Sequence, residues 1–253
     1  MKPRRAEPSD IEAITKVHIR TMPLDPQWNY RFPYRNEHPE DHYKYTKMLL
    51  EYFLDPSYDD WLVMVVEDSL EPGGPTEIVS FGVWDVSYVN KRRYGPGYKT
   101  QDRKCHFQGP CAAKRGGGSR RDANPEHFKA FSQGQKKAYQ KYFAPIGPEQ
   151  IHLQILATLP EYQRRGHASS LCRWAMELVC QEGLKDMSVM ASPMGYELYK
   201  SLGWDVVGTF WIQVPGEEEK LVLRAMMYKP PKLEGSSDSE EEVQVANGRC
   251  AIV

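Results

Sequence analysis

The stretch IHLQILATLPEYQRRGHASSLCRWAMEL, residues 151–178, decides the fold of this chain. It begins as an apolar-rich run that breaks at Pro160, and a basic segment containing Gly166 follows. From Ser169 onward apolar side chains recur at three- and four-residue spacing, which gives a helix one apolar face. The sequence therefore predicts a strand, a tight turn and the N-terminus of a helix.

This helix N-terminus is the first candidate binding site. Its backbone N–H groups have no partner inside the helix and attract an anion. The groups belong to Gly166, His167, Ala168 and Ser169. Gly166 has no Cβ, so a ligand can approach the backbone closely, and Arg164 and Arg165 add positive charge. The expected ligand is a phosphate or a pyrophosphate.

The turn Gln163-Arg164-Arg165-Gly166-His167-Ala168 resembles the Q/R-x-x-G-x-G/A loop of the GCN5-related N-acetyltransferases. In that family the loop holds the pyrophosphate of acetyl-coenzyme A (acetyl-CoA). Residues 191–204, ASPMGYELYKSLGW, are similar to the final helix of the family, and the resemblance extends over roughly residues 3–230. The alternative is an ordinary strand, turn and helix with basic turn residues.

The resemblance implies an α/β (α+β) fold over residues 1–230, with a mixed central sheet of about six to seven strands flanked by helices. Periodicity and turn residues predict the individual elements. Strands are expected at 2–6, 61–67, 77–86, 150–158, 185–191, 204–214 and 220–228, and helices after Asp10, at 39–54, at 125–143, after Ser169 and after Ser192. Residues 231–253 form an acidic, Ser-rich tail that is expected to be disordered.

A basic insertion at about 87–148 precedes the fourth strand. Residues 91–141 hold fourteen Lys or Arg against three acidic residues, and the first half of the insertion has little hydrophobic content. Three readings stay open: a lid over the acceptor site, a patch for an acidic partner, or a solvated insertion. Cys105, His106 and Cys111 lack the spacing and the fourth ligand of a zinc site, so no metal is expected.

The chemistry is expected on the strand at 150–158. Alternation places His152, Gln154, Leu156 and Thr158 on one face, and Ile151, Leu153, Ile155 and Ala157 on the other. The resemblance implies a bulge in this strand that frees backbone N–H groups. Leu156 would then bind the thioester carbonyl, and Ala157 and Thr158 would lie along the pantetheine arm.

Two side chains are candidates for acid–base chemistry. His152 titrates near neutrality in its free form and is a candidate base, with a structural hydrogen-bonded histidine as the alternative. Tyr199 aligns with the tyrosine that the family uses beside the thioester sulfur, where it protonates or orients the thiolate. Its alternative is a tyrosine packed against the sheet. Ser192, ahead of Pro193, is expected to border the cofactor.

Composition limits the remaining classes of protein. The net charge of −1 does not favour nucleic acid or an anionic membrane as a partner, and no apolar run approaches a membrane span. Five cysteines without regular spacing suit a reducing compartment, so a cytoplasmic protein is expected. The terminal residues CAIV fit the C-a-a-X pattern, so Cys250 would give weak membrane attachment if prenylated, and a chance match is the alternative.

The expected function is transfer of an acetyl group from acetyl-CoA to a small-molecule amine by direct attack in a ternary complex. Cys172 and Cys180 fall on the helix after the loop, so neither is placed to carry a covalent intermediate. Two alternatives remain: acetylation of a protein lysine or N-terminus, and a silent acyl-CoA-binding module.

Overall fold

The computed structural model describes residues 2–95, 97–98 and 119–231. Within this part of the chain one sheet of seven strands forms the centre, in the order β1-β2-β3-β4-β5-β7-β6. The strands are β1 (Arg4–Arg5), β2 (Trp61–Asp68), β3 (Glu77–Asp85), β4 (Gln150–Thr158), β5 (Asp186–Ala191), β6 (Asp205–Ile212) and β7 (Leu221–Tyr228). β4 and β5 run parallel, and the other neighbouring strands pair antiparallel. The predicted mixed α/β fold is confirmed.

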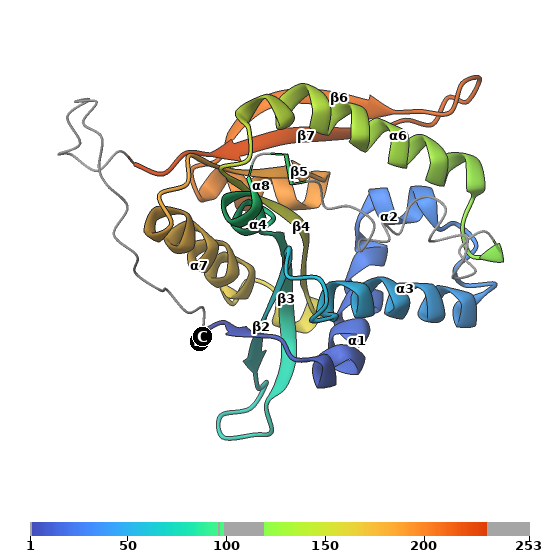
Figure 1. Ribbon diagram of the computed structural model, residues 1–253. Coiled ribbons are helices and arrows are strands. Elements are labelled where there is room, and N and C mark those ends of the chain that lie inside the picture. Colours follow the sequence, from blue (N-terminus) through green and yellow to red (C-terminus); the bar gives the residue numbers. More distant parts are fainter. Residues whose placement is uncertain (1, 96, 99–118, 232–253) are drawn as a thin grey trace, which may run out of the picture.

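Helices cover both faces of this sheet (Figure 1). They are α1 (Ile11–Thr21), α2 (Pro26–Arg31), α3 (Pro39–Leu54), α4 (Tyr88–Tyr94), α6 (Pro125–Tyr142), α7 (His167–Gln181) and α8 (Pro193–Ser201). On one face α1 and α3 bury a cluster that contains Ile14 and Phe81. On the other face α7 buries a cluster that contains Leu171 and Trp84. The periodic apolar residues of each helix thus face the sheet, because burial of that stripe stabilises the helix.

α6 forms a bridge at one end of the molecule. It runs along β6 (Figure 1) and packs against both β6 and α2. Phe131 of α6 is 2% exposed and shares a cluster with Ile212 and Leu223 of the β6–β7 hairpin. Residues 125–143, predicted as a helix, therefore join the sheet to α2.

β4 carries a bulge at Gln154. Val83 of β3 pairs with Ile155 and Trp84 pairs with Leu153, so Gln154 has no partner on β3. A bulge inserts one extra residue and shifts the alternation of side chains by one position. The bulge implied by the family resemblance is confirmed.

This shift makes the predicted division of β4 into two faces wrong. Leu156 packs in the same cluster as Leu153, beneath α7, although strict alternation placed them on opposite faces. Ile155 and Ala157 pack on the α1 and α3 side. The period of two holds only while each residue has one partner across the ladder.

β4 and β5 separate beyond the bulge. They pair from Gln150 with Asp186 to Leu153 with Val189, and no residue of β5 pairs with 154–158. A gap therefore opens between the C-terminal halves of two neighbouring strands.

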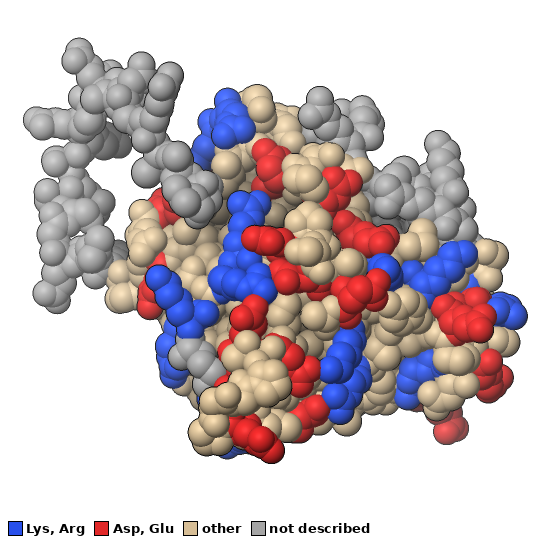
Figure 2. Space-filling model, turned by 90° about the horizontal axis from the view of Figure 1, so that it is seen from below, with Lys and Arg blue, Asp and Glu red and all other residues tan. Residues whose placement is uncertain are grey.

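Arginines in the described part of the basic insertion pair with acids. Arg92 contacts Glu149 and Glu182, the latter at 3.2 Å, from the short helix α4 that the sequence analysis missed. Arg121 contacts Asp41 at 2.9 Å. Figure 2 shows basic and acidic side chains intermixed on the face of the molecule that it presents. These arginines of the insertion therefore carry much less net charge than their number suggests.

Several predictions fall outside the described residues. The Lys/Arg-rich first half of the insertion, with Cys105, His106 and Cys111, lies in 99–118, and the tail with Cys250 lies in 232–253. In the part of the chain that the structure describes, no helix is both long and apolar enough to span a membrane.

Candidate active site

A cleft of about 1530 Å³ opens where β4 and β5 separate. Its lining comes from α1, α2, α3, α6, β4, α8 and the turn before α7. It contains the following residues of the predicted site: His152, Leu156, Ala157, Thr158, Gln163, Arg164, Gly166, His167, Ala168, Ser169, Ser192 and Tyr199. Arg165 is the one predicted residue that does not line it. Segments far apart in the sequence, from α1 to α8, thus meet around one cavity.

The N-terminus of α7 lies at one end of the cleft. Gly166 is the residue before the helix, with φ 89° and no side-chain cap, and the first turn holds no acidic residue. The first bond of the helix runs from the Ser170 N–H to the Gly166 carbonyl. The N–H groups of His167, Ala168 and Ser169 therefore have no partner inside the helix and meet the cleft. A Cβ on Gly166 would meet nothing within 4 Å, so its Cα faces open space.

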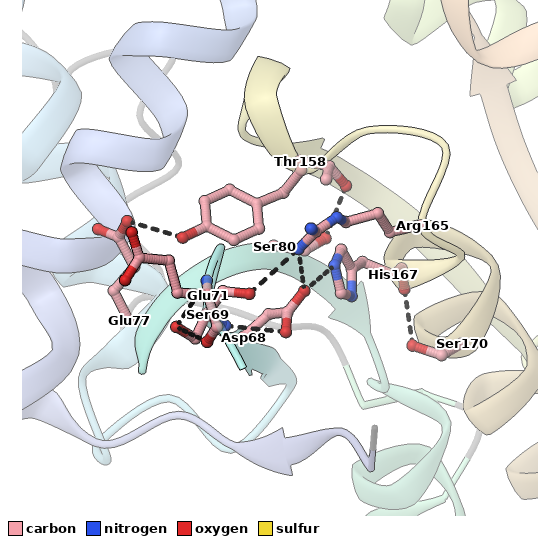
Figure 3. Close-up of polar contacts among 10 residues, drawn as sticks. Asp68, Ser69, Glu71, Glu77, Ser80, Thr158, Arg165, His167 and Ser170 are labelled. Carbon is pink, nitrogen blue, oxygen red and sulfur yellow. Dashed lines mark hydrogen bonds and ion pairs between the residues drawn. The ribbon is translucent and has the colours of Figure 1, made fainter. Parts of the chain in front are cut away.

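Arg165 does not line the cleft but points towards Asp68 of β2 (Figure 3). Its guanidinium donates to Asp68 at 2.9 Å and to the Ser69 carbonyl at 3.2 Å. His167 places Nε2 3.0 Å from the same Asp68 carboxylate. Burial acts to raise the pKa of Asp68, but the Ser69 N–H, Arg165 and His167 lower it more, so the carboxylate is ionised. The side chain of Arg165 therefore does not supply the positive charge that was expected from it at the anion site.

Of the two arginines of the turn, Arg164 is the one that lines the cleft. Its φ of 64° is in the left-handed region, which is uncommon for a residue with a side chain. Strained residues of this kind gather at binding sites, where the surrounding structure holds them in place. The turn therefore presents one arginine to the cleft and uses the other to fasten itself to β2.

The backbone of β4 presents two N–H groups to the gap. The Leu159 N–H donates to Val79 of β3, and the Ala157 carbonyl accepts a bond from Ser80 Oγ, also on β3. Because the direction of backbone groups alternates along a strand, the N–H groups of Leu156 and Thr158 point to the opposite edge. There β5 has already separated.

Thr158 is fixed in place by three contacts. Its carbonyl accepts bonds from Thr21 Oγ1 at 3.2 Å and Gln163 Nε2 at 3.3 Å, and its hydroxyl lies 2.8 Å from Ser80 Oγ. Gln163 thus holds the end of β4 against the turn. Ala157, by contrast, turns its backbone towards β3 and meets the cleft only with its side chain.

Tyr199 lies on α8 at the wall of the cleft. It is 5% exposed and packs against Trp204, with the ring centroids 5.4 Å apart. Burial raises the pKa of Tyr199 well above its ordinary value, so the hydroxyl keeps its proton at neutral pH. A Cβ on Gly195 would lie 2.8 Å from the ring, so the glycine makes room for it. Ser192 begins α8 by accepting the Gly195 N–H at 3.3 Å.

His152 lies on β4 with a defined tautomer. The Ser188 hydroxyl donates its one proton to Gln150 Oε1 at 2.9 Å, so it accepts from His152 Nδ1–H, also at 2.9 Å. Nε2 therefore carries the lone pair that a base needs. Burial lowers the pKa of His152 to about 4, against an opposing effect of Asp85. The expectation of a titration near neutrality is corrected, because the ring is 8% exposed.

The other half of the cleft is lined by aromatic side chains. Those from the first helices are Trp28, Phe32, Tyr45, Tyr52 and Phe53. Four of them, Trp28, Phe32, Tyr52 and Phe53, also belong to the hydrophobic clusters.

Three polar residues of this half were missed by the sequence analysis: His18, Asp25 and Arg31. Asp25 had a detectable signal, because Asp before Pro26 is a typical helix start, and its carboxylate accepts the Gln27 N–H at 3.0 Å. Arg31 lies between Tyr30 and Phe32 in the sequence, and no local pattern marks it.

Comparisons with known proteins agree with this architecture. The sequence is 24% identical over 226 residues to a protein from Stachybotrys chartarum called Acetyltransferase, covering 89% of this chain and 90% of that protein. The structure is similar to the crystal structure of "histone acetyltransferase HPA2 and related acetyltransferase" from Corynebacterium glutamicum ATCC 13032, with a TM-score of 0.52. That match has 17% identity and covers 93% of this chain and 98% of the other. No family model matches the sequence.

Proposed function

We propose that this chain, which has the fold of the GCN5-related N-acetyltransferases, moves an acetyl group from acetyl-CoA to a small-molecule amine. The observation that carries the proposal is a single cleft that joins an anion site at α7 to two free N–H groups of β4. The relative from Stachybotrys chartarum supports the same reaction class.

The residues at α7 fit the phosphates of the donor. A helix N-terminus with unpaired N–H groups binds phosphate through these groups and through the helix dipole. Gly166 leaves open space where a ligand can approach, and Arg164 supplies a positive charge at the same end of the cleft. When bound, acetyl-CoA supplies the activated acetyl group.

The N–H groups of β4 hold the reacting part of the donor. We assign the Leu156 N–H to the thioester carbonyl oxygen and the Thr158 N–H to the pantetheine arm. A preorganised donor of this kind stabilises the negative charge that grows on the oxygen during attack, and its loss costs roughly 10²–10³-fold in kcat. Thr158 is well suited to this role, because its other polar groups are already bonded.

Two side chains move the protons. His152 Nε2 accepts the proton of the incoming amine, directly or through a water molecule. Tyr199, whose hydroxyl stays protonated, donates a hydrogen bond or its proton to the leaving thiolate. Cys172 is fully buried and burial raises its pKa to about 12, so it remains a thiol and does not carry the acetyl group.

A small acceptor fits this cleft better than a protein segment. α6 packs against α2 and against β6, and it lines the cleft with Phe131 and Tyr139, so it leaves less room there for a protein segment. Thiol release with a panel of aryl amines, polyamines, amino acids and lysine peptides tests the proposal. Thiol release with small amines would support the proposal. Release with lysine peptides alone would show that the acceptor is a protein. Binding of coenzyme A without any thiol release would show that the chain is a silent acyl-CoA-binding module.

The acidic limb of kcat/KM is expected near pH 4. The base must be neutral, and His152 is protonated only as the pH falls through its pKa of about 4. His152→Ala should lose this limb and roughly 10²-fold or more of its activity. Asp85→Asn is the matched control for the assignment. Because the Asp85 charge raises the pKa of His152, the limb should move to lower pH. An unchanged limb in His152→Ala would give the proton to another group.

A further inference from the structure

Arg31 presents a cation without a counterion in the aromatic half of the cleft. Its guanidinium lies 4.0 Å from the ring centroid of Phe131 and 4.9 Å from that of Trp28, and Nε donates to the Gln27 carbonyl at 3.1 Å. Among the residues that the structure describes, no carboxylate lies within ion-pair distance of it. A guanidinium has five N–H donors, so most of them are free to bind a ligand.

Arg120 lines the same cleft but, unlike Arg31, has a counterion. It also stacks on an aromatic ring, 4.3 Å from the centroid of Phe32, but it makes two bonds to Asp122 at 2.8 and 2.7 Å. Asp25 acts on Arg31 only at longer range, since its carboxylate accepts from the Gln27 N–H and side-chain amide at 3.0 and 3.4 Å. A buried cation is costly unless an anion pairs with it. Arg120 has such a pair, whereas the half-buried Arg31 has none among the described residues, so an anionic ligand can supply it.

His18 is a second polar group without a partner. It is 1% exposed and lines the cleft beside Trp28, with ring centroids 4.8 Å apart. Neither of its ring nitrogens has a hydrogen-bond partner in the described part of the chain. Burial, with Arg31 and His42, lowers its pKa to about 3, so the ring is neutral and can donate or accept one bond. A buried polar group of this kind normally has a partner, and here the cleft is the place where a ligand can supply it.

We propose that Arg31 binds an anionic group, a carboxylate or a phosphate, carried by the acceptor amine, and that His18 hydrogen-bonds the acceptor beside it. This inference rests on the proposed function for the identity of the acceptor. The planar guanidinium can take either anion through two parallel bonds. The aromatic side chains between the two ends favour an apolar or aromatic body.

α6 indicates how long the acceptor is. Phe131 stacks under Arg31, and Tyr139, eight residues further along α6, contacts His152 with ring centroids 5.5 Å apart. Eight residues of a helix span about 12 Å. The anionic group and the amine should therefore lie roughly 10 Å apart, which corresponds to an elongated amino acid rather than an α-amino acid.

The test compares 8-aminooctanoic acid with its carboxamide, and with the matching aminoalkylphosphonate. Calorimetry in the presence of coenzyme A measures binding without turnover, and thiol release with acetyl-CoA measures transfer. We expect the acid or the phosphonate to bind at least tenfold more tightly than the amide, and the stronger of the two identifies the anion. Arg31→Met should bring this ratio close to one. Lys129→Met, which removes an exposed cation of α6 that does not line the cleft, should leave the ratio unchanged.

The outcomes separate the two proposals. Equal binding of acid and amide to the unmodified protein, or a preference that survives Arg31→Met, would overturn the anion site even if both amines are acetylated. The first of these comparisons needs no variant and so does not depend on the folding of Arg31→Met. An anion preference without any thiol release would instead support the site and contradict the proposed transfer.

Discussion

Gly166→Asp is expected to reduce the affinity for coenzyme A by at least roughly 10²-fold. The new carboxylate would stand at the N-terminus of α7, where the N–H groups of residues 167–169 are free, and would occupy the place of the phosphate. It would also add a negative charge that repels the ligand. The backbone contributes as well, since Gly166 has φ 89°, where a residue with a Cβ is strained by about 1–2 kcal/mol. Calorimetric titration with coenzyme A measures the effect.

Gly183→Asp is the matched control. Gly183 follows the C-terminal end of the same helix with φ 62°, and a Cβ there would also meet nothing within 4 Å. It carries the same backbone strain and the same added charge but does not line the cleft. Its coenzyme A affinity should therefore be unchanged, while its thermal stability should fall at least as much, because a carboxylate is unfavourable at the C-terminal end of a helix. Unchanged affinity in Gly166→Asp would show that the turn before α7 is not the phosphate site.

Tyr199→Phe is expected to lower kcat on the order of 10²-fold with little change in coenzyme A affinity. The hydroxyl acts on the thiolate, which exists only as the bond to the acetyl group breaks, so its loss affects the transition state more than binding. The phenylalanine ring keeps the packing against Trp204, so the fold should be retained. Single-turnover thiol release, with circular dichroism to check the fold, measures the change.

Tyr196→Phe is the matched control on α8. Tyr196 lies one turn earlier, outside the cleft, and its ring stacks under Arg224 at 4.3 Å, a contact that phenylalanine keeps. Its kcat should be unchanged. The high pKa of Tyr199 makes full proton transfer to a thiolate uphill, since free thiols titrate near 8.5. A loss nearer tenfold would therefore assign the proton to water and leave Tyr199 as an orienting donor, and full activity would remove it from the mechanism.

Residues close together in sequence predicted most of the fold. The bounds of the helix at 39–54 and the strand at 150–158 agree with α3 and β4. The strand, turn and helix at 151–178 are also confirmed. These elements follow from period, proline and glycine, which act within a few residues, so the sequence carries them directly.

The chemical state of the site depends on contacts between distant residues. Arg165 looked like a ligand for phosphate, but Asp68, 97 positions away, binds its guanidinium. His152 looked like a base that titrates near neutrality, but burial lowers its pKa, and Ser188, 36 positions away, fixes its tautomer. The unpaired state of Arg31 likewise appears only when α2, α6 and the cleft are assembled.

The sequence by itself thus determined the order of elements, the glycine turn before α7 and the residue types available to the cleft. The tertiary structure alone decided the phase of β4 after Gln154, the gap between β4 and β5, and the charge and partners of each polar side chain. The physical reason is the distance along the sequence over which each kind of interaction acts. Backbone preference and hydrophobic period are local, whereas burial, ion pairing and hydrogen bonding set protonation states through neighbours that only the folded chain brings together.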